Sequence, residues 1–537
     1  MTAWRCTLAV RLLLCVAVGQ SWSAFPAEEQ DPTFWNLKGK KALRQALDLQ
    51  PNVHQAKNLL LFLGDGMGIS TVTAARILKG QMAGKTGEET SLIMDTFPYV
   101  AFSKTYSVDQ QMPDSAATAT AYLCGVKAIY GTLGLSAAAR RNQCNTTFGN
   151  EVQSVLHRAR AAGKSVGIVT TAQVQHASPA ASYSRTANRD WYSDVDLTPE
   201  AKQHGCRDIA YQLVHNTDIN VILGGGRYYM LPVETPDPEY NGYTGAWLDK
   251  TNLIEKWLQG KKNARYVWNR RDLELVDEDD VEYLMGKDRR TCATSWTVTR
   301  PLTRRCQRWW RKQSRSSART QRASTSLWKM STSFYCTLCC EIDHGHHDGK
   351  VKLALTETVQ FDLAVEKGLE MTSALDTLTV VTADHSHVFT FGGYSPRGNP
   401  VLGLSDKLGL DQKPFTTVLY GNGPGFQVEN GTRPVVNSVM TNDKNYKQQA
   451  AVPLGSETHG SEDVAIFARG PMAHLFHGVQ EQSYVAHAMA FAACIEPYDN
   501  CLLEVHPDAN RAPSAPGSAL LALMGALLLS LHAVLAA

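Results

Sequence analysis

The stretch Asn58-Leu59-Leu60-Leu61-Phe62-Leu63-Gly64-Asp65-Gly66-Met67-Gly68 begins as an unbroken apolar run and ends at glycines around an aspartate. A short continuous apolar run predicts a strand that is buried on both faces of a parallel sheet. Similar runs occupy residues 165–171, 221–223 and 378–382, each followed by polar residues or glycines, with helical stretches such as 352–369 between them. The sequence therefore predicts an α/β fold with its polar clusters at the strand ends, where open α/β sheets bind ligands.

The composition excludes some classes of function and leaves others open. The chain has 537 residues, of which 43% are hydrophobic, and a formal net charge of only +2. A chain of this length can bury a large core, and the balanced charge gives no general basic surface for nucleic acid.

Both ends of the chain resemble processing signals. Residues 1–23 combine Arg5, an apolar stretch and a small-x-small site, which is typical of a signal peptide. Residues 519–537 are almost wholly apolar and follow a Pro/Ser/Ala/Gly spacer, which favours a GPI-attachment propeptide over residues 509–537, with Asp508 or, second, Asn510 as the attachment site. A transmembrane anchor is the alternative. We therefore expect a protein on the extracellular face of the plasma membrane.

Residues 113–121 predict the start of a helix, because Pro113 and Asp114 precede a run of small residues. Ser115 would then lie at the helix N-terminus, where free backbone N–H groups and the helix dipole favour an anion. This position suits a serine nucleophile or a phosphate-binding group. An Asp-Ser pair is also a common helix cap. The interpretation of Ser115 as a nucleophile therefore depends on which other residues the fold places beside it.

Four clusters of Asp, Glu and His carry side chains of the kind that zinc and magnesium bind. They are Asp65, residues 343–347, the pair Asp384-His385 and residues 457–463. A helical turn would place Asp343 and His347 on one face. A histidine-rich surface segment can also bind metal without catalysis. Four clusters, two of them at strand ends, favour a two-metal site that stabilises both the attacking and the leaving oxygen of an in-line displacement.

Seven motifs together resemble the alkaline phosphatase family, and most of all its animal, GPI-anchored, intestinal and placental branch. They are residues 63–68, 113–116, 175–179, 188–189, 342–347, 382–387 and 457–459. The resemblance covers about residues 30–286 and 342–501. It implies one catalytic domain over residues 24–508, with a large, mostly parallel sheet between helices and a smaller crown-type region. It also implies hydrolysis of phosphate monoesters to inorganic phosphate through a phosphoserine.

The resemblance implies a role for each matching residue. Ser115 would be the nucleophile, and Arg189 would bind two phosphate oxygens in a bidentate fork, with Asp114 also in the substrate site. The expected zinc ligands are Asp343, His347 and His459 for one ion, and Asp65, Ser115, Asp384 and His385 for the other. The expected magnesium ligands are Asp65 and Ser178, and Glu239 is the one expected ligand of a calcium ion.

The resemblance also implies pairings beyond the site. It pairs Cys144 with Cys206 and Cys494 with Cys501, and it leaves Cys124 as a free thiol. Tyr394 stands where the family uses a residue that reaches toward the partner subunit's site, which implies a homodimer. Independently of the resemblance, Asn145 and Asn430 begin N-glycosylation sequons, which fit a secreted protein.

The resemblance stops within residues 287–341. From Arg289 to Cys340 the chain has no Asp or Glu, whereas Arg, Lys and Trp recur. A basic, Trp-containing segment can bind nucleic acid or heparin, but a secreted phosphatase gives this little support, and we expect no nucleic-acid partner. Leu338 stands where the family has its remaining magnesium ligand, a glutamate. The magnesium site is therefore expected to be incomplete and the calcium site largely lost.

Two hypotheses of different class follow. The first is an active zinc and magnesium phosphomonoesterase, and the second is an anchored, catalytically impaired relic that still binds zinc or phosphate. A sulfatase or phosphodiesterase relative is a lesser alternative, because residues 115–117 lack the Cys/Ser-x-Pro-x-Arg pattern of sulfatases.

We also predict that residues 288–330 are an out-of-frame reading of a family segment. The codons of Trp309-Trp310 and Trp328-Lys329 would give valine and glutamate in one shifted frame. Residues 331–341 would then be extra, and a divergent loop is the alternative. On this hypothesis the chain loses a helix and a strand beside the metal site, so poor folding and little activity are expected.

Overall fold

The computed structural model describes residues 26–277, 280–287 and 333–501. The predicted signal peptide, the propeptide with Asp508 and residues 288–332 of the frame hypothesis lie outside the described residues. No helix in the described part of the chain is both long enough and apolar enough to cross a membrane.

The fold is organised around a ten-stranded sheet with the order β17-β2-β16-β8-β1-β7-β3-β4-β6-β5. Its strands are β1 (Asn58–Gly64), β2 (Tyr99–Lys104), β3 (Ser165–Gln173), β4 (Val221–Gly225), β5 (Ala264–Val267), β6 (Tyr283–Lys287), β7 (Ser333–Cys339), β8 (Thr377–Ala383), β16 (Val464–Arg469) and β17 (Gly478–Glu481). Among these strands β16 runs antiparallel to β2 and β8, and the other neighbours pair in parallel. The mostly parallel α/β sheet expected from the apolar runs is confirmed.

Helices of the described residues lie on both faces of this sheet and beyond it. They are α2 (Pro32–Leu47), α3 (Ile69–Met82), α4 (Ser115–Cys124), α5 (Val155–Ala161), α6 (Ala177–Ala180), α7 (Pro199–Gln203), α8 (Ile209–His215), α9 (Leu253–Leu258), α10 (Arg270–Glu274), α12 (Glu341–His347), α13 (Val351–Met371), α14 (Ser438–Asn442) and α15 (Tyr484–Ala492). The described part of the chain also has short 3-10 helices, which are η1 (Ala27–Gln30), η2 (Met94–Thr96), η3 (Cys144–Thr146), η4 (Arg227–Met230) and η5 (Ala473–Leu475).

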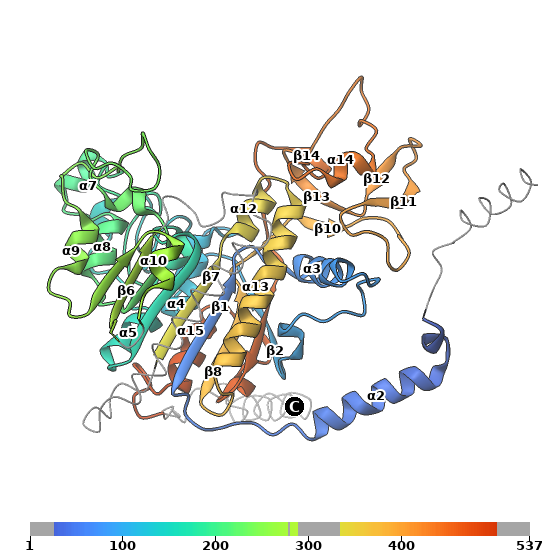
Figure 1. Cartoon of the computed structure of the whole chain (residues 1–537), viewed down its shortest axis with the longest axis horizontal. Helices are drawn as coiled ribbons and strands as arrows, with labels where there is room; N and C mark the ends of the chain where they lie inside the picture. The colour runs from blue at the N-terminus through green and yellow to red at the C-terminus, as the bar shows by residue number, and fades with distance from the viewer. Residues whose placement is uncertain (1–25, 278–279, 288–332, 502–537) are drawn as a thin grey trace, which may run out of the picture.

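Alternate residues of β1 pack on opposite sides of the sheet, as the period of a strand requires. Leu59, Leu61 and Leu63 belong to the core that includes residues of α4, α5 and α15. Leu60 and Phe62 belong to a second core with residues of α3 and α13. Burial on both faces explains why β1 is an unbroken apolar run, and Figure 1 shows β1 in the middle of the molecule with α13 alongside it.

Strand β7 corrects one expectation. The strand beside the metal site was expected to be lost, yet residues 333–339 form β7 between β1 and β3. That residues 331–341 are extra sequence stays a prediction. In this register Leu338 pairs with Leu63 and Thr170. Phe, Tyr and Thr residues favour strands, and the backbone groups of β1 and β3 provide partners on both sides. The sheet is thus continuous, while the expected loss of activity stays a prediction.

A smaller region stands apart from the main sheet, as expected for the crown-type region, and is drawn in orange in Figure 1. It contains a three-stranded sheet of β10 (Phe389–Phe391), β13 (Val418–Gly423) and β14 (Ala450–Pro453), and the pair β11 (Leu404–Leu408) and β12 (Pro414–Thr416). Between this region and the main sheet, β9 (Ser386–His387) pairs with β15 (His459–Gly460).

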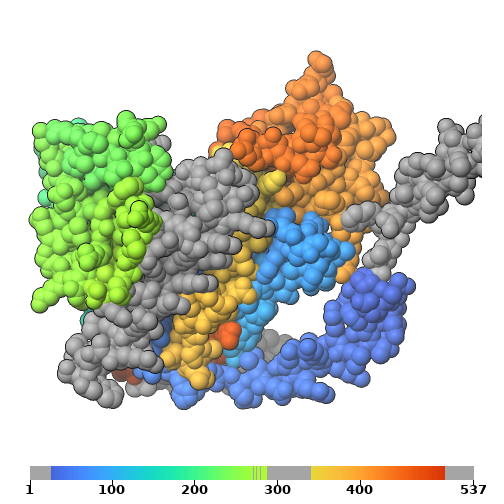
Figure 2. All heavy atoms as spheres, viewed as in Figure 1, coloured from blue at the N-terminus to red at the C-terminus, as the bar shows by residue number. Residues whose placement is uncertain are grey.

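Helix α2 lies away from the body of the molecule (Figure 2). It begins at Pro32 after an N-cap, Asp31, whose side chain accepts from the Thr33 backbone N–H. None of its residues is buried, and Trp35, Leu37, Leu43 and Leu47 are exposed by 52 to 80%. An apolar surface of this kind on an isolated helix is typical of a contact with another chain.

Candidate active site

Ser115 is the first residue of α4, as the sequence predicts. The Asp114 side chain caps this helix by accepting from the backbone N–H of Ala117 at 3.2 Å. Every residue of α4 is buried, because its small residues pack directly against the sheet. Ser115 itself is 2% exposed, and its Oγ lies 3.0 Å from His385 Nε2 and 3.4 Å from Asp65 Oδ1. The serine therefore meets two of the predicted metal ligands at a helix N-terminus.

The first predicted zinc group, Asp343, His347 and His459, is assembled from α12 and β15. The Nε2 atoms of His347 and His459 each lie 3.3 Å from Asp343 Oδ1, and they lie 3.1 Å from each other. Nδ1 of His347 lies 2.5 Å from the Glu457 carbonyl, and Nδ1 of His459 lies 2.6 Å from the Pro113 carbonyl.

This hydrogen bonding shows that the first group fits a cation. A carbonyl oxygen only accepts, so both Nδ1 atoms carry a proton, and when the two rings are neutral the Nε2 lone pair of each points at the other. Asp343 adds a carboxylate oxygen to the same point. Three acceptors without a proton between them repel one another, whereas zinc takes this set of nitrogen and oxygen ligands.

The second predicted group, Asp65, Asp384 and His385, lies at the ends of β1 and β8. His385 Nε2 lies 3.2 Å from Asp384 Oδ2 and 3.6 Å from Asp65 Oδ1. The three residues are completely buried, and together their oxygens and nitrogen also fit a divalent cation.

The backbone conformation of Gly66 explains why a glycine follows Asp65. Its φ of 72° lies in the left-handed region, and a Cβ there would come within 2.4 Å of His387 Nε2. Its backbone N–H donates to Asp384 Oδ1 at 2.9 Å. Only glycine lets the chain turn here, hold Asp384 and leave room for the histidine.

The carboxylates of the site hold their protons very differently. Burial and the nearby Asp343 raise the pKa of Asp65, and burial and Asp65 raise that of Asp384 well above its ordinary value. Burial alone would also raise the pKa of Asp343, but His347, His387 and His459 hold it well below its usual range. Buried acids at such short range need a compensating positive charge, which divalent cations supply.

Arg189 lies beside the serine helix. Its NH1 group donates to Asp114 Oδ2 at 2.9 Å, and its side chain is 14% exposed. Asp114 Oδ1 accepts from Gly131 N at 3.0 Å, so the carboxylate that orients the guanidinium is itself fixed. The arginine is thus positioned for a bidentate contact with an anion at the start of α4.

Two further residues of the site, His387 and Glu457, were not assigned as site residues from the sequence. His387 Nε2 lies 3.0 Å from Asp343 Oδ1, and its Nδ1 lies 2.5 Å from Glu457 Oε2. Both are also members of candidate metal groups. The motifs at 382–387 and 457–463 contain them, but spacing alone does not show which histidine faces Asp343.

The remaining predicted residues have different positions. Ser178, on α6, donates to Asp65 Oδ2 at 2.8 Å, which agrees with its expected place beside the second group. Glu239 Oε2 lies 3.3 Å from the buried Arg227, and the candidate metal groups of the described residues do not include Glu239. Tyr394 is 94% exposed, and both sequon asparagines, Asn145 and Asn430, are exposed.

The expected cysteine pairing is confirmed. Cys144 is bonded to Cys206, and Cys494 to Cys501. Cys124 is a buried thiol outside both disulfides, as expected, and burial raises its pKa to about 11.

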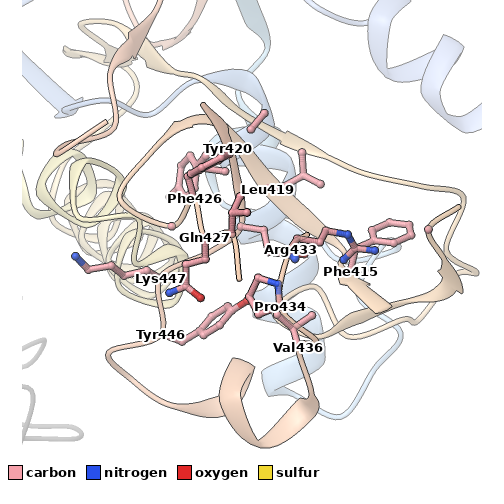
Figure 3. A pocket seen from close by; sticks show the side chains of 16 residues that line it. Phe415, Leu419, Tyr420, Phe426, Gln427, Arg433, Pro434, Val436, Tyr446 and Lys447 are labelled. Atoms are coloured by element: carbon pink, nitrogen blue, oxygen red, sulfur yellow. The ribbon is translucent and has the colours of Figure 1, made fainter. Parts of the chain in front are cut away.

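A separate pocket of about 430 Å³ lies in the smaller region (Figure 3). Phe415, Tyr420 and Tyr446 are among the side chains that line it. The Tyr420 hydroxyl lies 2.7 Å from His346 Nδ1, so the pocket wall contacts α12, which carries two predicted metal ligands, but contains none of the predicted site residues.

Comparisons with known proteins agree with this geometry. A model of the alkaline phosphatase family matches residues 56–495. The tissue-nonspecific alkaline phosphatase of Mus musculus is 51% identical over 527 residues, covering 95% of this chain and 97% of that protein. The Homo sapiens tissue-nonspecific isozyme is 51% identical over 498 residues, covering 90% of this chain and 93% of that protein.

Solved structures show the same fold at much lower identity. The alkaline phosphatase of the Antarctic bacterium TAB5 superimposes with a TM-score of 0.54 at 17% identity, covering 82% of this chain and 99% of that one. The Thermus thermophilus alkaline phosphatase superimposes with a TM-score of 0.55 at 18% sequence identity, covering 83% of this chain and 93% of that one. The intestinal and placental branch stays a prediction, since the relatives named above are tissue-nonspecific isozymes. With a family match across most of its length and relatives at about half identity, the chain is a phosphatase enzyme that belongs to the alkaline phosphatase family.

Proposed function

We propose that the chain hydrolyses phosphate monoesters through a phosphoserine at Ser115, at the outer surface of the cell. The observation that carries the proposal is the position of Ser115 Oγ at the start of α4, 3.0 Å from His385 Nε2 and 3.4 Å from Asp65 Oδ1. When bound, zinc in the two groups would neutralise phosphate charge and lower the pKa of the hydroxyl and water nucleophiles.

The residues of the chain bind and orient the phosphate. Free backbone N–H groups at the start of α4 attract its oxygens, and Arg189 holds two more, while Asp114 fixes the guanidinium. Ser115 Oγ attacks phosphorus as the bond to the alcohol breaks, which gives phosphoserine and the free alcohol. Water then attacks the phosphoserine, which returns Ser115 and releases inorganic phosphate.

The alcohol needs few contacts in this account. A phosphate monoester is recognised through its charge and through the in-line position of the nucleophile, and the groups that provide both lie around the phosphate. Broad specificity for the alcohol follows.

We also propose that the mature chain is a GPI-anchored, glycosylated homodimer. Residues 1–23 and 509–537 support secretion and anchoring at Asp508. The unburied helix α2 and the 94% exposed Tyr394 support a second copy, because both offer apolar surface to solvent. Release of the protein from cells by a phosphatidylinositol-specific phospholipase tests the anchor, and retention of residues 519–537 in the mature protein would contradict it.

An impaired relic is the second candidate, since Leu338 stands where the family has a magnesium ligand. Zinc analysis and p-nitrophenyl phosphate turnover on the purified full chain separate the two. We expect about two or more zinc ions per chain and turnover that chelation abolishes. Bound zinc without turnover would identify the relic, and the absence of both would contradict the proposal.

A further inference from the structure

A third group of candidate metal ligands adjoins the two described above. Asp65, His176 and Cys340 place one ligand atom each within 4.8 Å of one another. Asp65 connects this group to the second one, because its Oδ1 lies 3.6 Å from His385 Nε2 and its Oδ2 accepts from Ser178. The third group therefore occupies the side of Asp65 where the family resemblance places magnesium.

The fold holds Cys340 firmly in this position. It follows directly on β7, at the N-cap of α12, and it is fully buried. Its Sγ lies 3.9 Å from Thr170 Oγ1, on β3, the strand paired with β7. Cys340 takes part in neither disulfide.

His176 provides a second, independent indication of a ligand. Its Nδ1 atom is buried and, among the described residues, makes no hydrogen bond. Its other ring nitrogen lies 3.4 Å from Arg189. A buried ring nitrogen without a hydrogen-bond partner destabilises the fold unless a ligand or a water molecule satisfies it.

The donors of the third group do not fit magnesium. Magnesium is a hard cation that takes oxygen ligands in near-ideal octahedral geometry, whereas this group offers a thiol and an imidazole with a single carboxylate. Glu341, the residue after Cys340, directs its Oε1 to His344 Nδ1 at 3.3 Å. Thiolate and imidazole are ligands that zinc prefers.

We propose that the third metal position of this chain binds zinc in place of magnesium, through Cys340, His176 and Asp65. On binding, the thiol releases its proton to solvent and the sulfur becomes a ligand. The Ser178 hydroxyl orients Asp65 by donating to its Oδ2 at 2.8 Å. The proposed reaction does not depend on this site. The metal content of the purified chain tests it without any measurement of turnover.

The test uses the purified full chain, loaded with zinc in the presence of excess magnesium and freed of loosely bound metal by gel filtration. Elemental analysis is expected to give about three zinc ions per chain, and about two in Cys340→Ser. Cys124→Ser is the matched control, because Cys124 is also a buried thiol and lies in none of the metal groups of the described residues. It is expected to keep all three.

Cobalt provides a second readout. Cobalt-loaded protein is expected to show a thiolate-to-cobalt charge-transfer band that disappears in Cys340→Ser and stays in Cys124→Ser. If Cys340→Ser does not fold, Cys340→Asp replaces it, and this variant is expected to lose the band and take magnesium at the third position. The proposal would be overturned by magnesium at the third position of the unaltered chain, or by the absence of the cobalt band. It would also be overturned if the third zinc ion and the band both remained in Cys340→Ser.

Discussion

Glu457 Oε2 lies 2.5 Å from His387 Nδ1, and the opposite nitrogen of the same ring lies 3.0 Å from Asp343 Oδ1. Burial alone would lower the pKa of His387, but Glu457 and Asp343 raise it to about 10. The ring is therefore protonated at neutral pH and donates to both carboxylates. Glu457 thereby orients His387, and His387 orients the predicted metal ligand Asp343.

The variant Glu457→Gln removes this charge while keeping the size of the side chain. Because His387 then loses the partner that holds its proton and its orientation, we expect zinc affinity to fall by about 10- to 100-fold. Competition with a chromophoric chelator measures the affinity. Glu462→Gln is the control, since Glu462 lies outside the candidate metal groups. Equal loss in both variants, or no loss in Glu457→Gln, would contradict this role.

Replacement of Arg189 by lysine tests the phosphate site. Lysine keeps the charge but not the planar fork, so we expect phosphate to bind more weakly by about 1–3 kcal/mol. Inhibition by inorganic phosphate measures the change. Arg141→Lys serves as control, because Arg141 lies nearby, is 34% exposed and pairs with Asp190. Unchanged inhibition of Arg189→Lys would show that the fork of Arg189 does not bind the phosphate.

Lys164 predicts how stability depends on pH. It is 4% exposed, its Nζ donates to the Lys57 carbonyl, and burial lowers its pKa to about 8. The unfolded chain keeps this proton up to a pH of about 10.5. Between these values the unfolded state binds more protons, so the contribution of Lys164 to the free energy of unfolding rises with pH across this window.

Lys164→Met removes the cost of burying the charge. We expect the variant to be more stable than the unaltered chain at pH 7, by on the order of 2–3 kcal/mol. The advantage should shrink as pH rises above 8, where the folded chain has already lost this proton. Denaturant unfolding at pH 7 and pH 10.5 with equal metal loading measures it. A constant or growing advantage would show that the buried charge is not the cause.

The apolar runs predicted the central strands because burial on both faces leaves a clear pattern. Residues 59–63, 165–171 and 378–382 fall within β1, β3 and β8, and residues 221–223 begin β4. Strand β7 could not be predicted in the same way. Its sequence follows a segment that lacks the family pattern. Its position depends on the edges of β1 and β3 with which it pairs, and these edges lie side by side only in the assembled sheet.

The predicted zinc ligands could be found because several motifs carry them. His387 and Cys340 could not be assigned. The choice between His385 and His387 depends on the pairing of β9 with β15, which sets His387 opposite His459. The position of Cys340 depends on where β7 ends relative to β1, and no spacing in the sequence fixes that register.

Covalent labelling of Ser115 tests the central claim most directly. Turnover of a radiolabelled phosphate monoester by the full chain is quenched in acid, and the labelled peptide is then identified. The account predicts label on the peptide that contains Ser115, and none in Ser115→Ala, which should also lose most turnover. Label on another residue, or steady turnover with no labelled peptide at all, would contradict the account.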